Sequence, residues 1–346
     1  MSRRPVTDRE AGTVLLSTLL VLSLMSAVTL ALLATLRRSV TQTAELEARA
    51  QADLYARGAQ DFVQSQLDDL SGIDGELLNA ELREPQLTVL PFDNGSLSVS
   101  VSDGTHCFRL SALSDSSGTG SDAAQSRFSA LMQAIGLDNV QAARIAAAAV
   151  DWVDQDQQTR PGGAEDGTYQ SRIDLPHRTA NVPMESVSEL RAVDGMSEKL
   201  FQVLRPHLCI GEVGIPTRFN LDTAQPRHAP VLAAILTDVL EQSEAERLAL
   251  DLITSRPADG YGSTEGLAVT PALSGVDSVA QLPDLVFRPH RIVAEVIVRF
   301  GPIEQAQLLA YEGVDTGQST LSYRDWGWQS FPSLAWDLNE TESETP

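Results

Sequence analysis

Basic residues are scarce in this chain. Its 346 residues include 25 lysines and arginines against 47 aspartates and glutamates, so the formal net charge is −22. Proteins that bind nucleic acids need a basic surface to neutralise phosphates, and this balance argues against that class of partner. An acidic surface favours solubility, cation binding or a partner with a basic face instead.

Sequence signatures of several enzyme classes are also missing. The five histidines are scattered along the chain, and none has the spacing of a zinc site. No Gly-x-Ser-x-Gly elbow, no P-loop and no dinucleotide-binding glycine pattern occurs. A Ser-His-Asp site built from distant residues needs no such signature, so that class stays open.

The chain does contain one long apolar segment. The uncharged run extends from Thr13 to Leu36 and follows a charged leader that ends at Gly12. As a helix it spans roughly 36 Å, enough to cross a bilayer with some tilt. Secretory signals have shorter apolar regions, of roughly 7–15 residues. Because Arg3, Arg4 and Arg9 hold the leader in the cytoplasm, we predict one transmembrane helix with the bulk of the chain outside.

A polar but still helical pattern continues from Arg37 to Leu70. This segment contains no proline, and its apolar residues recur at near-helical spacing. Gly72 and Gly75 then end the pattern. The sequence predicts one continuous rod that leaves the membrane and leans, as an amphipathic helix, on a folded domain.

Short alternating segments predict an antiparallel sheet in two parts. Turn signals at Asp93–Gly95 and Ser102–Gly104 separate the strands of the first part. The first part consists of Gln86–Leu90, Ser96–Ser102 and His106–Leu113. The second part, near the end of the chain, consists of Arg291–Phe300, Glu304–Gly313 and Ser319–Gln329.

Between the two groups of strands the signals are helical, after a polar linker at Ser114–Asp122. We predict an α+β fold in which an all-α domain is inserted within the sheet, because three separate domains would leave very small sheets. Ser186–Leu208 resembles a helix-hairpin-helix turning at Asp194-Gly195, which we interpret as structural packing. The predicted divisions are leader 1–12, transmembrane helix 13–36, continuing helix 37–70, first part of the sheet 71–113, inserted domain 114–285, second part of the sheet 286–332 and an acidic disordered tail 333–346.

The stretch from Val150 to Tyr169 gathers carboxylates around a Pro-Gly-Gly turn. Such a cluster repels itself unless a cation compensates it. Hard oxygen ligands at irregular spacing suit Ca²⁺, although the EF-hand spacing is absent. Paired carboxylates also cleave glycosides, but no aromatic-rich groove accompanies them; an acidic loop capping a helix is the plain alternative. The candidate ligands are Asp151, Asp154, Asp156, Glu165 and Asp166.

The chain has only two cysteines, Cys107 and Cys209. Outside the cytoplasm they are free to form one disulfide, and the alternative is two unpaired buried thiols. Cys107 lies in a predicted strand, and Cys209 lies at the end of a predicted helical unit. We predict a bridge that ties the insert to the sheet.

The junction of leader and apolar helix resembles a type IV prepilin signal. In that family a prepilin peptidase cuts after the glycine, and the new N-terminus is usually methylated. The resemblance implies cleavage between Gly12 and Thr13, with Thr13 methylated. Most members carry glutamate as the fifth mature residue, where this chain has Ser17. That glutamate pairs with the subunit above, so its absence implies a tip subunit.

Three further motifs resemble the type II secretion system protein K family of large minor pseudopilins. They are "DWVDQD…RPGGAEDGTY", "HRTANVPMESVSELRAVDGM" and "FNLDTA", in this order. The resemblance covers nearly the whole chain, and it implies a pilin-like sheet with a large helical insert, together with calcium binding. The implied partners are the minor pseudopilins I and J, the prepilin peptidase and the inner-membrane assembly platform.

The sequence therefore predicts a non-enzymatic tip subunit of a type II secretion pseudopilus, which helps to initiate or cap assembly for export of folded proteins. It is expected to be a single-pass inner-membrane protein with a cytoplasmic N-terminus and a periplasmic bulk. One alternative is a membrane-tethered periplasmic hydrolase using Asp151 or Glu165, against which the leader glycine counts. Another is a DNA-uptake component using the helix-hairpin-helix, against which the acidic charge counts.

Overall fold

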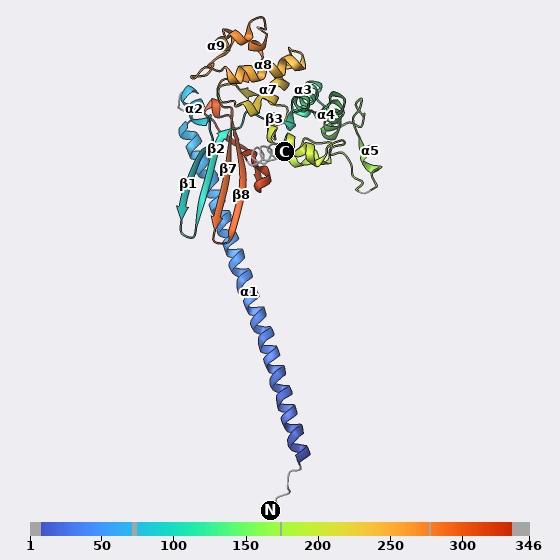
Figure 1. Ribbon diagram of the computed structural model, residues 1–346, viewed down its shortest axis with the longest axis vertical. Coiled ribbons are helices and arrows are strands. Elements are labelled where there is room, and N and C mark those ends of the chain that lie inside the picture. The colour runs from blue at the N-terminus through green and yellow to red at the C-terminus, as the bar shows by residue number, and fades with distance from the viewer. Residues whose placement is uncertain (1–7, 71–74, 174, 277, 334–346) are drawn as a thin grey trace, which may run out of the picture.

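The structure is a computed structural model that describes residues 8–70, 75–173, 175–276 and 278–333. The start of the predicted leader, Gly72 and nearly all of the predicted tail lie outside these described residues. A long helix carries a β-sheet on its C-terminal half, and further helices lie beyond the sheet, at the end remote from the N-terminus (Figure 1).

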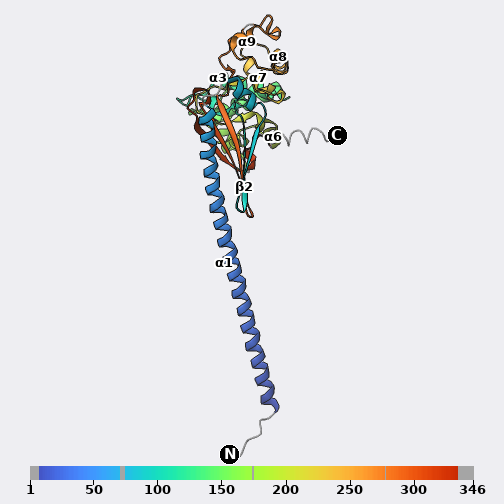
Figure 2. The same cartoon turned by 90° about the vertical axis from the view of Figure 1, so that its left-hand side faces the viewer.

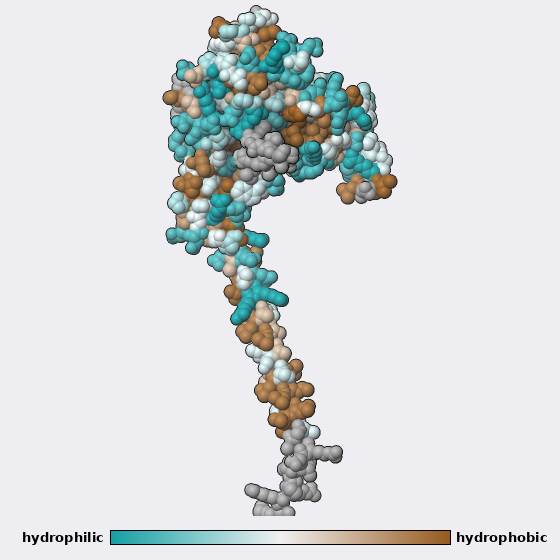
Figure 3. All heavy atoms as spheres, in the orientation of Figure 1, coloured by the Kyte–Doolittle hydropathy of each residue, from teal (hydrophilic) through white to brown (hydrophobic). Residues whose placement is uncertain are grey.

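Helix α1 runs without a break from Asp8 to Leu70; it contains the continuous rod predicted over Thr13–Leu70 and begins five residues earlier, within the predicted leader. Its N-terminal half is long and apolar enough to cross a membrane, and none of that apolar window is buried in the protein. Figure 3 shows this part of the helix as an exposed apolar rod below a mostly polar body. Hydroxyl groups within it donate to carbonyls one turn earlier, so they add no unsatisfied polar group in lipid.

The C-terminal half of α1 packs on the sheet through small side chains. Ala52, Ala56 and Ala59 are buried, and Val63 and Leu67 continue the same stripe at helical spacing. Alanines let the helix approach the strands closely. The amide of Gln307 reaches the Ala56 carbonyl at 2.7 Å, which fixes the helix against the sheet.

The sheet has five antiparallel strands in the order β1-β2-β7-β8-β9. Two of the three strands predicted for the first part of the sheet, and all three predicted for the second part, are present within a few residues of their predicted limits. The hairpin between β1 and β2 turns at Asn94, whose φ of 65° suits an Asn-Gly turn. The strands are β1 Gln86–Phe92, β2 Gly95–Asp103, β7 Arg291–Phe300, β8 Ile303–Glu312 and β9 Thr320–Trp326.

Because side chains alternate along each strand, one face of the sheet packs on α1 and the other packs on the C-terminal segment around Phe331. Ile292, Ala294 and Val296 of β7 face α1 in one core cluster. Leu308 of β8 lies on the opposite face, where Phe331 covers it. The short helix α2, Gly75–Leu82, precedes β1.

Residues 104–290, hereafter the insert, separate β2 from β7 in sequence although the two strands are neighbours. One large hydrophobic core joins the helices of the insert, and α7, almost wholly buried, lies at its centre. Figure 2 shows the insert capping the end of the sheet that points away from the N-terminus. Its α-helices are α3 Asp122–Ala134, α4 Asn139–Val153, α5 Asp166–Gln170, α6 Glu198–Leu204, α7 Ala229–Leu236, α8 Gln242–Thr254 and α9 Thr264–Ala268.

The prediction of an all-α insert was wrong in detail. Two short parallel pairs of strands also occur there, β3 Phe108–Arg109 with β4 Leu208–Cys209, and β5 Phe219–Asn220 with β6 Leu285–Val286. The predicted strand over His106–Leu113 was wrong too, because after β3 the chain turns into the 3₁₀-helix η1, Leu110–Leu113. Phe108, Leu110 and Leu113 all enter the core of the insert, so the apparent alternation does not correspond to two faces of a sheet.

The predicted hairpin at Asp194-Gly195 connects two short helices. The first is the 3₁₀-helix η2, Val187–Ala192, and the second is α6. Gly195 has a φ of +83°, which a residue with a side chain rarely adopts. Leu190 and Leu204 are both fully buried in the insert core, so the unit packs inward.

The motif Phe219–Ala224 fastens the insert to the sheet. The Asn220 amide donates to Asp103 Oδ2 at 2.8 Å, and the Thr223 hydroxyl donates to the same oxygen at 2.5 Å. Asp222 accepts from the backbone N–H groups of Tyr261 and Gly262, at 2.6 and 2.9 Å. The polar residues of this motif are therefore buried structural ties.

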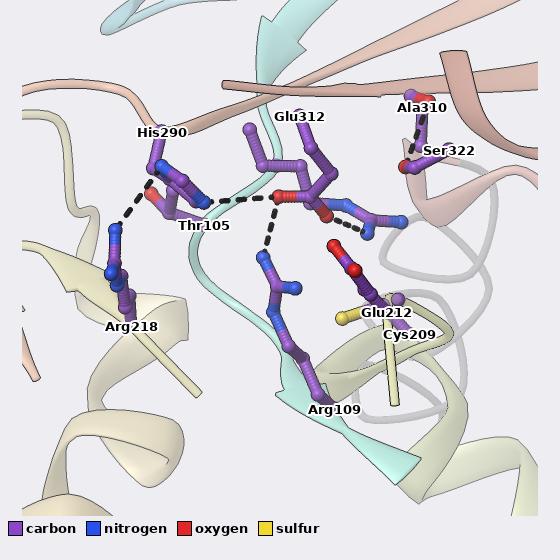
Figure 4. Close-up of polar contacts among 12 residues, drawn as sticks. Thr105, Arg109, Cys209, Glu212, Arg218, His290, Ala310, Glu312 and Ser322 are labelled. Carbon is purple, nitrogen blue, oxygen red and sulfur yellow. Dashed lines mark hydrogen bonds and ion pairs between the residues drawn. The ribbon is translucent and has the colours of Figure 1, made fainter. Parts of the chain in front are cut away.

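A buried charged cluster also joins the insert to the sheet. Glu312, at the end of β8, accepts from Arg109 of β3 at 2.7 Å and from Arg291 of β7 at 2.6 Å (Figure 4). The nitrogen Nε2 of His290 lies 3.4 Å from the same carboxylate. We call these four residues the junction cluster. Cys209 of β4 is the register partner of Arg109, and it forms a disulfide with Cys107, which directly precedes β3. Both cysteines lie within the insert, so the prediction that this bridge ties the insert to the sheet was wrong.

Candidate metal site

The candidate site lies where α4 ends. Asp138 caps the start of this helix by accepting from Val140 N–H at 2.9 Å, and the following run of alanines is buried against neighbouring helices. The helix ends at the cap residue Asp154, whose backbone is extended. The chain then forms a loop that returns to α5, and Gly162, with a φ of +82°, permits its sharp turn.

The loop brings three of the five predicted carboxylates together. Asp154, Asp156 and Glu165 each place one oxygen within 4.8 Å of the others. Asp154 and Glu165 are 3% and 5% exposed, whereas Asp156 is exposed to solvent. Two acidic groups are therefore held next to each other with almost no access to water.

Two oxygen atoms of this group are buried without a hydrogen-bond partner among the described residues. They are Oδ1 of Asp154 and Oε1 of Glu165. Burial of an unpaired polar atom is costly, and native proteins avoid it unless another ligand satisfies the atom. Burial, followed by the neighbouring carboxylates, raises the pKa of Asp154 to about 6 and that of Glu165 to about 7. The arrangement is thus unfavourable until a proton or a cation compensates it.

Asp151 lies beside this group, but its carboxylate is hydrogen-bonded to the backbone of the loop. Its carboxylate accepts from the backbone N–H of Arg160, with distances of 3.3 and 3.2 Å to its two oxygens. Gly163 passes so close that a Cβ there would stand 2.1 Å from Asp151 Oδ2. Burial raises the pKa of this carboxyl group. Asp151 therefore anchors the turn that positions Glu165.

Asp166, also predicted as a ligand, is not among the three carboxylates that converge. Its Oδ1 accepts from both the backbone N–H and the hydroxyl of Thr179, each at 2.9 Å. Thr179 lies 13 residues further along the chain, and no motif in the sequence singles it out. Arg160, by contrast, was visible as the only basic residue in the acidic stretch, and its role was missed.

The donor set fits a hard divalent cation. Three carboxylates supply oxygen ligands of the type that Ca²⁺ prefers, and the two unpartnered oxygens are the atoms that a cation would satisfy. The cavity between sheet and insert, of about 140 Å³, is lined by Phe201, Val293, Tyr323 and their neighbours, and none of the five carboxylates lines it.

Comparison with known proteins identifies the family. Two family models match, both described as type II secretion system protein K, over residues 106–212 and 219–288. Both matches lie within the insert. Protein K of Klebsiella pneumoniae is 30% identical over 311 residues, which cover 88% of this chain and 94% of that protein. The chain belongs to the type II secretion system protein K family.

Other relatives agree with this assignment. Protein K of Aeromonas hydrophila is 30% identical over 310 residues, covering 84% of this chain and 91% of that protein. The crystal structure of a GspK-GspI-GspJ complex from enterotoxigenic Escherichia coli is similar with a TM-score of 0.67 at 22% identity, covering 83% of this chain and 99% of that chain. As a member of this family, the chain is a minor pseudopilin of a type II secretion system.

Proposed function

We propose that this protein K forms the tip of the pseudopilus, where it helps to initiate or cap assembly, and that it has no catalytic role. The observation that carries the proposal is the bulky insert, which covers the end of the sheet remote from the membrane helix. A subunit stacked directly above would have to displace it. Ser17 supports the same placement, because its hydroxyl is satisfied by the Val14 carbonyl at 2.9 Å and needs no partner subunit.

The tip placement is tested with the minor pseudopilins I and J of the same secretion system. GspK is crystallised with GspI and GspJ in the similar structure, so the corresponding partners are the natural candidates here. We expect one copy of each protein in a complex measured by analytical ultracentrifugation. Immunogold labelling of purified pseudopili should then mark one end. Labels spaced along the filament would contradict the tip placement even if the complex forms.

Maturation by a prepilin peptidase is a second part of the proposal. Cleavage between Gly12 and Thr13 would leave α1 anchored in the inner membrane and a periplasmic body, with Thr13 methylated. In cells with the peptidase, mass spectrometry should find Thr13 at the mature N-terminus, and Gly12→Glu should retain the leader and abolish secretion. Intact leader on the wild-type protein in peptidase-containing cells would refute this maturation.

Calcium binding by Asp154, Asp156 and Glu165 is the third part. Binding to the folded form alone stabilises it by roughly 2.7 kcal/mol at a free concentration about 100 times the dissociation constant. We therefore expect a chelator to lower the melting temperature of the detergent-solubilised chain and Ca²⁺ to restore it. Mg²⁺ should restore less, since it demands a tighter octahedral shell.

The control for the calcium prediction is the double variant Asp154→Ala, Glu165→Ala. It removes the two buried carboxylates that hold the unpartnered oxygens. Its melting temperature should not respond to chelator or to Ca²⁺. A full response in this variant would place the calcium site elsewhere, and no response in the wild type would show that these carboxylates bind no calcium.

A further inference from the structure

Arg160 stands on one side of the buried carboxylates. Its Nε lies 3.8 Å from Asp151 Oδ1 and 3.8 Å from Asp154 Oδ2. The Arg160 side chain is 22% exposed. One oxygen of Asp154 therefore faces a positive charge of the protein, whereas the other, Oδ1, is buried and has no hydrogen-bond partner in the described part of the chain.

The rest of the guanidinium is held by the first turn of α3 and by the linker before it. Nη1 donates to Asp122 Oδ1 at 2.5 Å and to Gln125 Oε1 at 3.0 Å, and Nη2 donates to the Gly120 carbonyl at 3.2 Å. A Cβ at Gly120 would come within 2.7 Å of Nη2 and 2.9 Å of Asp154 Oδ2. The linker thus fits closely around the arginine, so its charge has a fixed position.

We propose that Arg160 is a resident counter-ion of the cation site: it holds the loop in place when no ion is bound and sets a ceiling on the affinity for the ion. This inference rests on the proposed calcium site. Arg160 neutralises part of the charge of Asp151 and Asp154 from one side. The cation approaches from the side of the unpartnered oxygens and shares Asp154 with the arginine.

The electrostatic consequence has a definite sign. A fixed positive charge next to a ligand repels a divalent cation, and this repulsion is strong at short range in a site that is mostly shielded from water. If the charge is removed, the ion should bind more tightly although the protein without ion becomes less stable. If Arg160 merely supported the loop, its removal would loosen the ligands and weaken the binding of the cation.

Two substitutions separate charge from support. Arg160→Gln removes the charge, whereas Arg160→Lys keeps the charge and loses the planar fork of donors. The backbone N–H that donates to Asp151 remains in both variants. Arg299→Gln is the matched control, because it removes the same charge from an exposed pair with Glu304 in the sheet.

The experiment is a Ca²⁺ titration of the full-length chain in detergent, by calorimetry, with melting temperatures measured in chelator. We expect Arg160→Gln to bind Ca²⁺ about tenfold more tightly and to melt at a lower temperature than wild type in chelator. Arg160→Lys should bind within about threefold of wild type, as should Arg299→Gln.

The outcomes distinguish this inference from the calcium proposal. Wild-type protein that binds no Ca²⁺ overturns the calcium site itself. Wild-type protein that binds Ca²⁺ while Arg160→Gln binds it equally or more weakly overturns the counter-ion role and leaves the site intact. If Arg299→Gln bound Ca²⁺ more tightly by the same factor as Arg160→Gln, the effect would come from net charge, and the counter-ion role would also be overturned.

Discussion

Replacing Glu312 by glutamine should be the most damaging single change in the body of the protein. The substitution keeps the shape of the side chain but leaves Arg109 and Arg291 buried without a countercharge, and their side chains are only 4% and 1% exposed. Removal of one partner from such a buried ion pair costs about 3–5 kcal/mol. We expect this loss in the free energy of unfolding, measured in urea by circular dichroism.

The matched control for Glu312 is Glu304→Gln. Glu304 also pairs with an arginine, Arg299, but both side chains are about half exposed, at 42% and 51%. Exposed pairs contribute at most about 1 kcal/mol. If the two glutamine variants lost similar stability, the junction cluster would not hold the insert on the sheet.

Loss of the disulfide should produce the second large effect. Cys107 and Cys209 are 102 residues apart in sequence, and their Cα atoms lie 5.7 Å apart. In the chain-entropy model, a closed loop of about 100 residues is stabilised by up to about 4.7 kcal/mol. The double variant Cys107→Ser, Cys209→Ser should therefore unfold at a much lower urea concentration than the oxidised wild type.

Reduction provides the internal check on this prediction. Reductant should lower the unfolding midpoint of the wild type and leave that of the double serine variant unchanged. Because Cys209 and Arg109 are register partners in β3 and β4, the disulfide and the junction cluster share one support. Their losses should not add. Two reactive thiols in the folded, oxidised protein would contradict the bridge.

Hydrophobic periodicity was sufficient to predict most of the elements. The limits of β7 agree with the prediction residue for residue, because Arg291–Phe300 is rich in valine and isoleucine, which favour strands, and ends at a Gly-Pro turn. The prediction failed over His106–Leu113, where the residues also appear to alternate. There the surrounding helices bury nearly the whole segment, so its apolar side chains report tertiary packing and not one face of a strand.

The candidate site was predictable only as a set of residues near each other in sequence. Asp154, Asp156 and Glu165 converge because a glycine turn folds the loop back, and that turn is visible in the sequence. The different roles of Asp151 and Asp166 depend on contacts with the backbone at Arg160 and Thr179. Spacing carries no information about such contacts, so it could not separate anchors from ligands.

The unbroken α1 also has a mechanical consequence. With 63 residues it is about 95 Å long at 1.5 Å per residue. Its far end is fixed to the sheet through Ala52, Ala56 and Val63. A displacement of the N-terminal, apolar part of α1 along the helix axis therefore displaces the sheet and the insert with it. A rotation of that end by one residue position, about 100°, turns the whole insert through the same angle. A force or a rotation applied to the N-terminal part of α1 is therefore transmitted along the helix to the sheet and the insert.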